Sequence, residues 1–264
     1  MIPTEAVQNA QSWYEDGVKR IESGSISLGI TYLEKAIALF AEEDSPRVLT
    51  YARHHKLLGL KLDRRYEEAE SQFADVMQGY TQLEDSYGKG LLLAHLAECL
   101  AAQERWERAQ AVFHLASVVA ENDQHKQLLA YIRLQQGQLC RQRDDLARAE
   151  RMFQAAERLC NAEQTLLTYA QCRWLRAEAL SRLGETTQAV ALLEDVHTQL
   201  IRAKQFRDAL EPLTLLKQLY EDMGMEEDKD RIARLMHLCG QQILRTDDVR
   251  REKAYLGPSI SRQG

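Results

Sequence analysis

Proline and glycine are scarce in this chain, which has 4 Pro and 13 Gly among 264 residues. Ala, Leu, Glu, Gln and Arg are abundant instead, and all five are good helix formers. Long apolar runs are also missing, since no stretch of about 18 consecutive apolar residues occurs. The N-terminal segment has neither a basic region nor an apolar core, so we expect no secretory signal peptide. The composition therefore predicts an all-helical protein that is not inserted in a membrane.

Closely spaced metal ligands and cysteine pairs are absent as well. The five cysteines include no C-x-x-C pair, which predicts reduced thiols and a cytoplasmic location. None of the seven histidines is spaced at i, i+4 from another. The adjacent His54 and His55 are expected to point to different faces of a helix, so they make a poor chelate. We predict polar histidines of a groove or surface and no metal site.

The sequence also lacks the motifs of common enzymes. It has no G-x-S-x-G, no phosphate-binding G-x-x-x-x-G-K-[ST] and no G-x-G-x-x-G. His95 and Cys99 lie one helical turn apart, but no third group that would orient the imidazole is evident. We therefore predict a protein without catalytic activity and without a cofactor. The alternative, an enzyme that uses this pair, predicts turnover that is lost on Cys99→Ser or His95→Ala.

A nine-residue pattern recurs along the chain. RWERAQAVF at 105–113 returns as RYEEAESQF at 65–73 and as DLARAERMF at 145–153. Counted in steps of 40 from Ala109, a small residue is followed after four residues by Phe or Leu and after seven by another small or β-branched residue. Offsets of 0, 4 and 7 define one face of an α-helix. The clearest copies are Ala69/Phe73/Val76, Ala109/Phe113/Ala116 and Ala149/Phe153/Ala156.

A second helix precedes each of these helices and carries a small residue, such as Gly17, Ala97, Gly137 or Ala177, at the same 40-residue step. Polar or glycine-containing breaks separate the helices. Each unit should therefore hold two helices of roughly 16–18 residues. Ser45–Pro46 is typical of an N-cap followed by the first helical residue. Pro212 is expected either in a first turn or at a kink.

This pattern resembles the tetratricopeptide repeat. The resemblance rests on the W-x-x-x-G of Trp13 and Gly17, on the Gly24 turn, and on the Ala-x-x-x-Phe-x-x-Ala of 109–116 and 149–156. The usual unit has about 34 residues, so this chain is a long variant with 40. The resemblance implies an all-α fold, a right-handed α-solenoid of about six antiparallel helix pairs. Its departures include Leu57 in place of a small residue.

The repeats set the expected domain organisation. We predict a repeat domain over 1–240, followed by a C-terminal capping helix and flexible tail over 241–264. The sixth repeat has Lys229 and Ala233 where Ala and Phe are expected, which suits a terminal unit that faces water. The predicted repeats are 10–49, 50–89, 90–129, 130–169, 170–209 and 210–240.

The resemblance also implies that the first helix of each pair lines a concave groove where partners bind. Helical spacing within each repeat then selects one stripe of residues. The predicted groove residues are Tyr14, Tyr51, His54, Leu58, Lys61, Leu91, Glu98, Tyr131, Gln138, Arg141, Trp174 and Glu178. Further positions of the stripe include Gln171 and Glu211.

Two interpretations of the stripe's aromatic residues stay open. Tyr131 and Trp174 either anchor a partner or pack between neighbouring helices. The charges of the stripe are mixed, and the net charge of −6 disfavours nucleic acid as a partner. We therefore predict an adaptor or scaffold that binds a peptide or amphipathic helix of another protein. The alternatives are a regulatory sensor of a small molecule or signalling peptide, and self-assembly through the end helices; the oligomeric state is not predicted.

Overall fold

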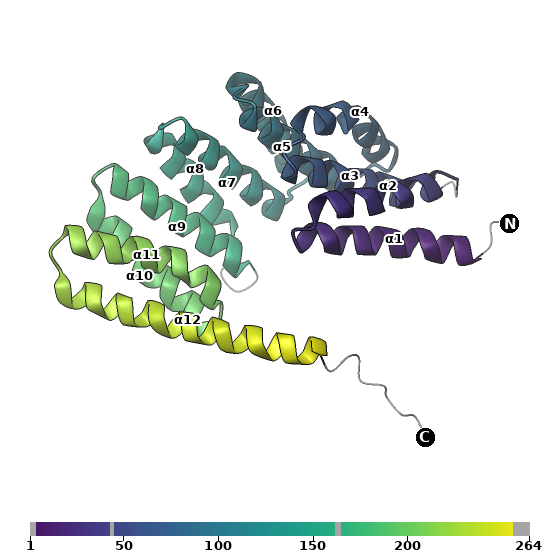
Figure 1. The fold of residues 1–264 in the computed structure, drawn as a ribbon. Helices are drawn as coiled ribbons and strands as arrows, with labels where there is room; N and C mark the ends of the chain where they lie inside the picture. The colour runs from purple at the N-terminus through teal and green to yellow at the C-terminus, as the bar shows by residue number, and fades with distance from the viewer. Residues whose placement is uncertain (1–3, 43–44, 162–164, 256–264) are drawn as a thin grey trace. The chain divides into compact units, whose positions relative to one another are not determined.

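The computed structural model of the protein describes residues 4–42, 45–161 and 165–255 (Figure 1). Within these ranges it contains twelve α-helices and no strand, which confirms the all-α prediction. From α2 onward each helix begins 20 residues after the one before it, so each pair repeats after 40. The helices are α1 (Thr4–Glu22), α2 (Ile26–Glu42), α3 (Pro46–Leu62), α4 (Tyr66–Gln82), α5 (Ser86–Ala102), α6 (Trp106–Asn122), α7 (Lys126–Gln142), α8 (Leu146–Leu159), α9 (Leu166–Arg182), α10 (Thr186–Arg202), α11 (Phe206–Asp222) and α12 (Glu226–Tyr255).

The chain forms two compact units, residues 1–136 and 137–264. Unit 1 holds α1 to α6 and the start of α7, and unit 2 holds the rest of α7 and α8 to α12. From α1 to α6, and again from α8 to α12, each helix packs against the next one along the chain. First helices of adjacent pairs also meet, α1 with α3, α3 with α5, and α9 with α11. This contact brings side chains from different repeats together on one face of each unit.

The recurring Ala–Phe–Ala stripe forms the core between helices. Phe113 of α6 and Phe153 of α8 are at most 1% exposed. A small residue on the neighbouring helix makes room for the ring: a Cβ added to Gly137 would lie 2.5 Å from Cε1 of Phe153. Since the ring fills the space that a side chain at 137 would occupy, the small–large–small pattern is explained by packing.

Nine of the breaks between helices share one backbone conformation. The second residue after the helix end has a positive φ at Gly24, Gly184 and Gly224. The same conformation occurs at Arg64, Glu84, Glu104, Gln124, Asp144 and Lys204. In each described turn two amide N–H groups bond back to the last helical turn, as when Arg65 N–H donates to the Leu60 carbonyl at 2.9 Å. This hydrogen bonding satisfies carbonyls that the helix end leaves open.

Several local predictions have clear outcomes. Ser45 is the N-cap of α3 with Pro46 at its first position, although the Ser45 side chain makes no capping hydrogen bond. Pro212 lies inside α11 and is buried. Helix α12 continues past residue 240 to Tyr255, while the predicted tail from 256 lies outside the described residues. The predicted repeat and domain boundaries stay predictions. Over the described ranges, no helix combines the length and apolarity that crossing a bilayer requires.

Candidate functional site

The predicted groove residues all lie on first helices, and all except His54 are half-buried. In unit 1, five of them converge on one cavity of about 360 Å³: Tyr14, Tyr51, His54, Leu58 and Leu91. The cavity is open to solvent on one side and is walled mainly by rings. Its remaining lining residues are His55, Tyr80, Asp85, Tyr87, Gly88 and His95.

Two histidines from adjacent repeats meet in the wall of this cavity. His54 Nε2 of α3 lies 3.0 Å from His95 Nδ1 of α5, and His54 Nδ1 lies 2.6 Å from the Tyr80 hydroxyl. Both imidazoles are nearly buried, at 6% and 7% exposure. Burial, reinforced by the positive charge of nearby Lys61, lowers the pKa of His54 to about 3 and that of His95 well below its ordinary value. The pair is therefore uncharged at neutral pH.

A neighbouring set of hydrogen bonds fixes the rim of the cavity. Asp85 caps α5 by accepting from Gly88 N–H at 2.8 Å, and its second oxygen accepts from the Tyr51 hydroxyl at 3.3 Å. The Tyr14 hydroxyl lies 3.2 Å from His55 Nδ1. Gly88 must lack a side chain here, since an added Cβ would overlap the Tyr80 ring. The polar groups of the rim thus bond to one another.

Next to the cavity, Glu98 of α5 connects its own helix to α3 and α7. Its carboxylate accepts from Lys61 Nζ of α3 at 2.6 Å and from the Tyr131 hydroxyl of α7. The charges of Lys61 and Glu98 therefore neutralise one another. Because both are only partly exposed, neither is left to hold a charged ligand. Tyr131 is packed between neighbouring helices, and burial followed by the Glu98 charge raises its pKa.

The structure corrects the prediction for two histidines. His54 and His95 were expected as polar residues of a groove or surface, but they are buried and bonded to each other. Both side chains line the cavity. His54 therefore lies on the stripe where it was predicted, but it is more buried than a surface residue. His95, His55 and Tyr80 were missed as cavity residues. A signal existed: His54 and His95 are 41 residues apart, close to one repeat length.

The His95–Cys99 pair has no catalytic arrangement. Cys99 is 1% exposed, and burial raises the pKa of its thiol to about 11. A protonated, buried thiol is a poor nucleophile. Among the described residues, no group of three or more His, Cys, Asp or Glu side chains is arranged to hold a metal ion.

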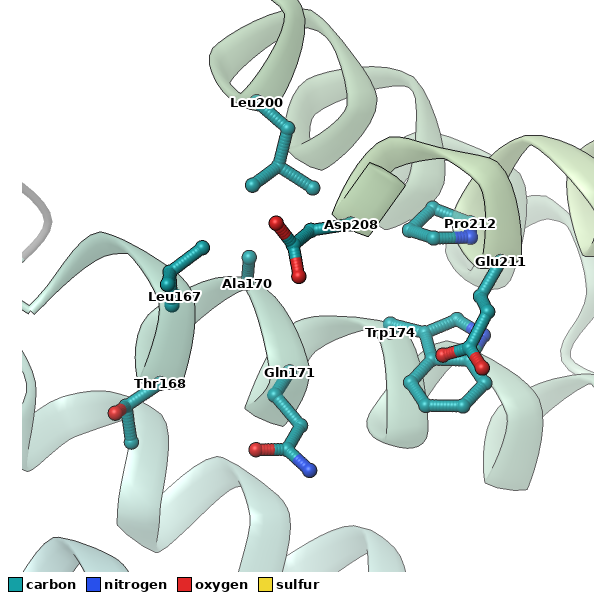
Figure 2. Close-up of a pocket in the computed structure, with 9 residues that line it drawn as sticks. All are labelled: Leu167, Thr168, Ala170, Gln171, Trp174, Leu200, Asp208, Glu211 and Pro212. Atoms are coloured by element: carbon teal, nitrogen blue, oxygen red, sulfur yellow. The ribbon is translucent and has the colours of Figure 1, made fainter. Parts of the chain in front are cut away.

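Unit 2 carries the remaining predicted residues. Arg141 Nη1 donates to Glu178 at 2.7 Å, which joins α7 to α9. Gln138 is half-buried on α7. Trp174 lines a second cavity of about 270 Å³ between α9, α10 and α11 (Figure 2). Gln171 and Glu211 of the predicted stripe line it as well, with Leu167, Thr168, Ala170, Leu200, Asp208 and Pro212.

Comparison with known proteins finds likeness in fold alone. No protein-family model and no curated protein matches the sequence. The Rap conjugation gene regulator of plasmid pLS20, in complex with the Phr* peptide, is 12% identical, with a TM-score of 0.67 over 97% of this chain and 78% of its own. BtubC from P. vanneervenii is 13% identical, with a TM-score of 0.64 over 99% of this chain and 97% of its own.

A third similar structure is longer than this chain. Aspartyl phosphate phosphatase F from Bacillus subtilis is 13% identical, with a TM-score of 0.64 over 89% of this chain. The present chain spans 60% of that protein's length. Solved tetratricopeptide-like repeats of a kinesin light chain also match. By fold, the chain is therefore a tetratricopeptide-like helical-repeat protein, as the Ala–Phe–Ala pattern predicted.

Proposed function

We propose that this protein binds a peptide segment of another protein, and that the unit 1 cavity takes an apolar or aromatic side chain of that segment. The observation that carries the proposal is the convergence of Tyr14, Tyr51, His54, Leu58 and Leu91 on one cavity. These residues come from three different helices of a repeat array. In arrays of this kind, stacked first helices provide an extended binding surface.

The chemistry of the cavity supports an apolar occupant. The buried imidazoles of His54 and His95 are neutral, and the hydroxyls of Tyr51 and Tyr80 already have partners within the protein. A polar or charged side chain would lose its hydration there and would find few free partners among these groups, which costs free energy. An aromatic or aliphatic side chain would instead exchange water for the surrounding rings. The pLS20 regulator, whose structure contains a peptide, has the same fold.

The role that follows is that of a cytoplasmic adaptor or scaffold without catalysis. A sensor of a small molecule is the second candidate. It is favoured by the cavity volume of about 360 Å³, which lies within the roughly 300–1,000 Å³ of ligand pockets. A thermal-shift screen with metabolites and nucleotides tests it, because a ligand of the folded state raises Tm.

The peptide proposal is tested by selecting a random-peptide display library on the full chain. Calorimetry then compares the selected peptides on wild type, Leu58→Glu and Tyr87→Ala. Tyr87 is 43% exposed, so its truncation alters the cavity with little risk to the fold. We expect each substitution to raise Kd at least tenfold, or about 1.4 kcal/mol, because the apolar site is made polar or opened.

Leu115→Glu is the matched control. Leu115 is 51% exposed on α6, a second helix, so this variant should bind like wild type. Circular dichroism verifies that each variant is folded. Peptides that bind Leu58→Glu and Tyr87→Ala as tightly as wild type would refute the cavity as the site. Failure to select any peptide would refute the peptide proposal.

A further inference from the structure

We propose that the cavity of unit 2 is a binding site for an arginine side chain of a partner. Figure 2 shows the Asp208 and Glu211 side chains projecting from α11 into the cavity, with Gln171 and Trp174 of α9 across from them. The cavity residues thus supply two carboxylates, an amide and an indole, but no cationic group. This site is separate from the unit 1 cavity and does not depend on what that cavity binds.

Asp208 and Glu211 are exposed to solvent at this cavity, unlike the half-buried acidic residues that link the helices of this unit. Glu150, Glu157, Glu178 and Glu194 each bond to an arginine. Neither the Asp208 nor the Glu211 side chain has an ion-pair or hydrogen-bond partner within the described part of the chain. Because they lie three residues apart on one helix, they face the same space. Their mutual repulsion would be relieved by a cation between them.

The backbone contributes a second, independent acceptor. Pro212 lies inside α11 and has no N–H group. The carbonyl of Asp208, four residues earlier, therefore lacks the donor that an α-helix normally supplies. Asp208 and Pro212 both line the cavity, so this carbonyl belongs to the segment that borders the site. A ligand rich in N–H donors would satisfy it.

The apolar part of the cavity selects a guanidinium over a compact ammonium ion. Ala170 and Leu200 are buried in its wall, where the methylene stem of a long side chain can pack. The Trp174 indole offers a flat surface on which a planar guanidinium can stack. Arginine also carries five N–H donors in a fixed fork, enough to reach two carboxylates and a carbonyl together. Lysine has no planar group and fewer donors.

The test uses N-acetyl-arginine methylamide as the probe of the full chain. The protein has three tryptophans, so the indole N–H signal of Trp174 is identified by NMR from its loss in Trp174→Phe. We expect the arginine probe to shift this signal in a saturable manner. The uncharged analogue N-acetyl-citrulline methylamide should shift it at least tenfold less at equal concentration. Asp208→Asn combined with Glu211→Gln should weaken arginine binding at least tenfold.

The matched control is Glu227→Gln. Glu227 is an exposed carboxylate in the first turn of α12, as Asp208 is in the first turn of α11. The control therefore removes a helix-start charge without touching the cavity, and it should leave arginine binding unchanged. N-acetyl-lysine methylamide serves as a second cationic probe. Equal shifts from citrulline, equal binding by the doubly neutralised protein, or tighter binding of the lysine probe would each overturn the proposal. Leu58→Glu should not affect this titration, so its result is independent of the unit 1 test.

Discussion

The two units connect their helices with different chemistry on the same backbone plan. In unit 1 the cavity wall between α3 and α5 is held by uncharged rings, with His54 bonded to His95 and to Tyr80. Both units also have an ion pair between first helices, Lys61–Glu98 in unit 1 and Arg141–Glu178 in unit 2. In unit 2 further ion pairs link α8 to α9. Arg176 of α9 donates to Glu150 at 2.8 Å and to Glu157 at 3.0 Å on α8. The repeat determines which helices are in contact, but the side chains that connect them differ between the units.

A similar contact links the last three helices of unit 2. Glu194 of α10 accepts from the Tyr220 hydroxyl of α11 at 2.6 Å and from Arg231 of α12 at 2.5 Å. Burial alone would raise the pKa of the Glu194 carboxyl, but these two hydrogen bonds outweigh it, and the pKa is lowered. Unit 1 thus contains buried imidazoles that stay neutral in addition to its ion pairs, and the contacts of unit 2 described here use carboxylates that stay charged. Acid should therefore affect the two units over different pH ranges.

The largest effect is expected where the units are alike. Phe113→Ala in unit 1 and Phe153→Ala in unit 2 should each lower the free energy of unfolding by about 3–5 kcal/mol, because each removes a fully buried ring and leaves a cavity. Hydrogen exchange resolved by peptide measures the loss and should locate it mainly in the mutated unit. Losses of equal size in both units from either substitution would show that the units unfold together.

Binding provides a further control on these core variants. At a temperature where Phe113→Ala is still folded, it should bind peptides selected on wild type with nearly unchanged affinity. A fall in affinity with the fold intact would mean that the Phe113 face belongs to the binding surface and has been misassigned.

Acidification should separate the units. An unfolded histidine takes up a proton near pH 6.5, whereas native His54 does so near pH 3 and native His95 at a strongly lowered pKa. Between these values the unfolded state binds more protons, so the stability of unit 1 falls as the pH falls below 6.5. The loss is about 1.4 kcal/mol per pH unit for each histidine. Above pH 6.5 this contribution is fully present.

Unit 2 should respond to Glu194 at lower pH. The pKa of the native Glu194 carboxyl is below its ordinary value of 4.5, so its contribution is present above pH 4.5 and is lost as the pH falls through the lowered value. Hydrogen exchange by peptide at pH 7 and pH 5, corrected for intrinsic rates, measures both units in one sample. His54→Gln should reduce the acid sensitivity of unit 1. Equal destabilisation of both units at pH 5, or no effect of His54→Gln, would contradict this account.

The fold was accessible from the sequence because the packing rule repeats. One copy of Ala–x–x–x–Phe–x–x–Ala predicts only an amphipathic helix, but copies at 40-residue steps predict neighbours for every helix. The position of His54 on the first-helix stripe followed from the same counting. The burial of His54 did not, because it depends on Tyr80 and His95, which come from two other helices. Hydropathy describes a histidine as polar, but it does not show that two histidines form a hydrogen bond to each other and can therefore be buried.

The unit 2 cavity shows a second limit of prediction. The predicted stripe includes Trp174, Gln171 and Glu211. It does not include Asp208, which lies three residues before Glu211. Pro212 was left open between a first turn and a kink, although its place inside α11 is what frees the Asp208 carbonyl. Sequence spacing predicts which residues share one face of a helix. It does not show how deep a cavity between three helices is, or which polar groups line it.

The smallest effect is expected in the turns, where the units again share one backbone. Glu104 and Lys204 have φ values of 59° and 60°, in the left-handed region that costs a residue with a Cβ roughly 1–2 kcal/mol. Both side chains are exposed. Glycine relieves this strain but loses more chain entropy on folding, so Glu104→Gly and Lys204→Gly should each gain about 0.5–1 kcal/mol. Urea denaturation followed by circular dichroism measures the gain. Gly184→Ala, which introduces a Cβ at φ 87°, should show a loss of similar size, and an unchanged or raised stability there would mean that backbone strain does not govern these turns.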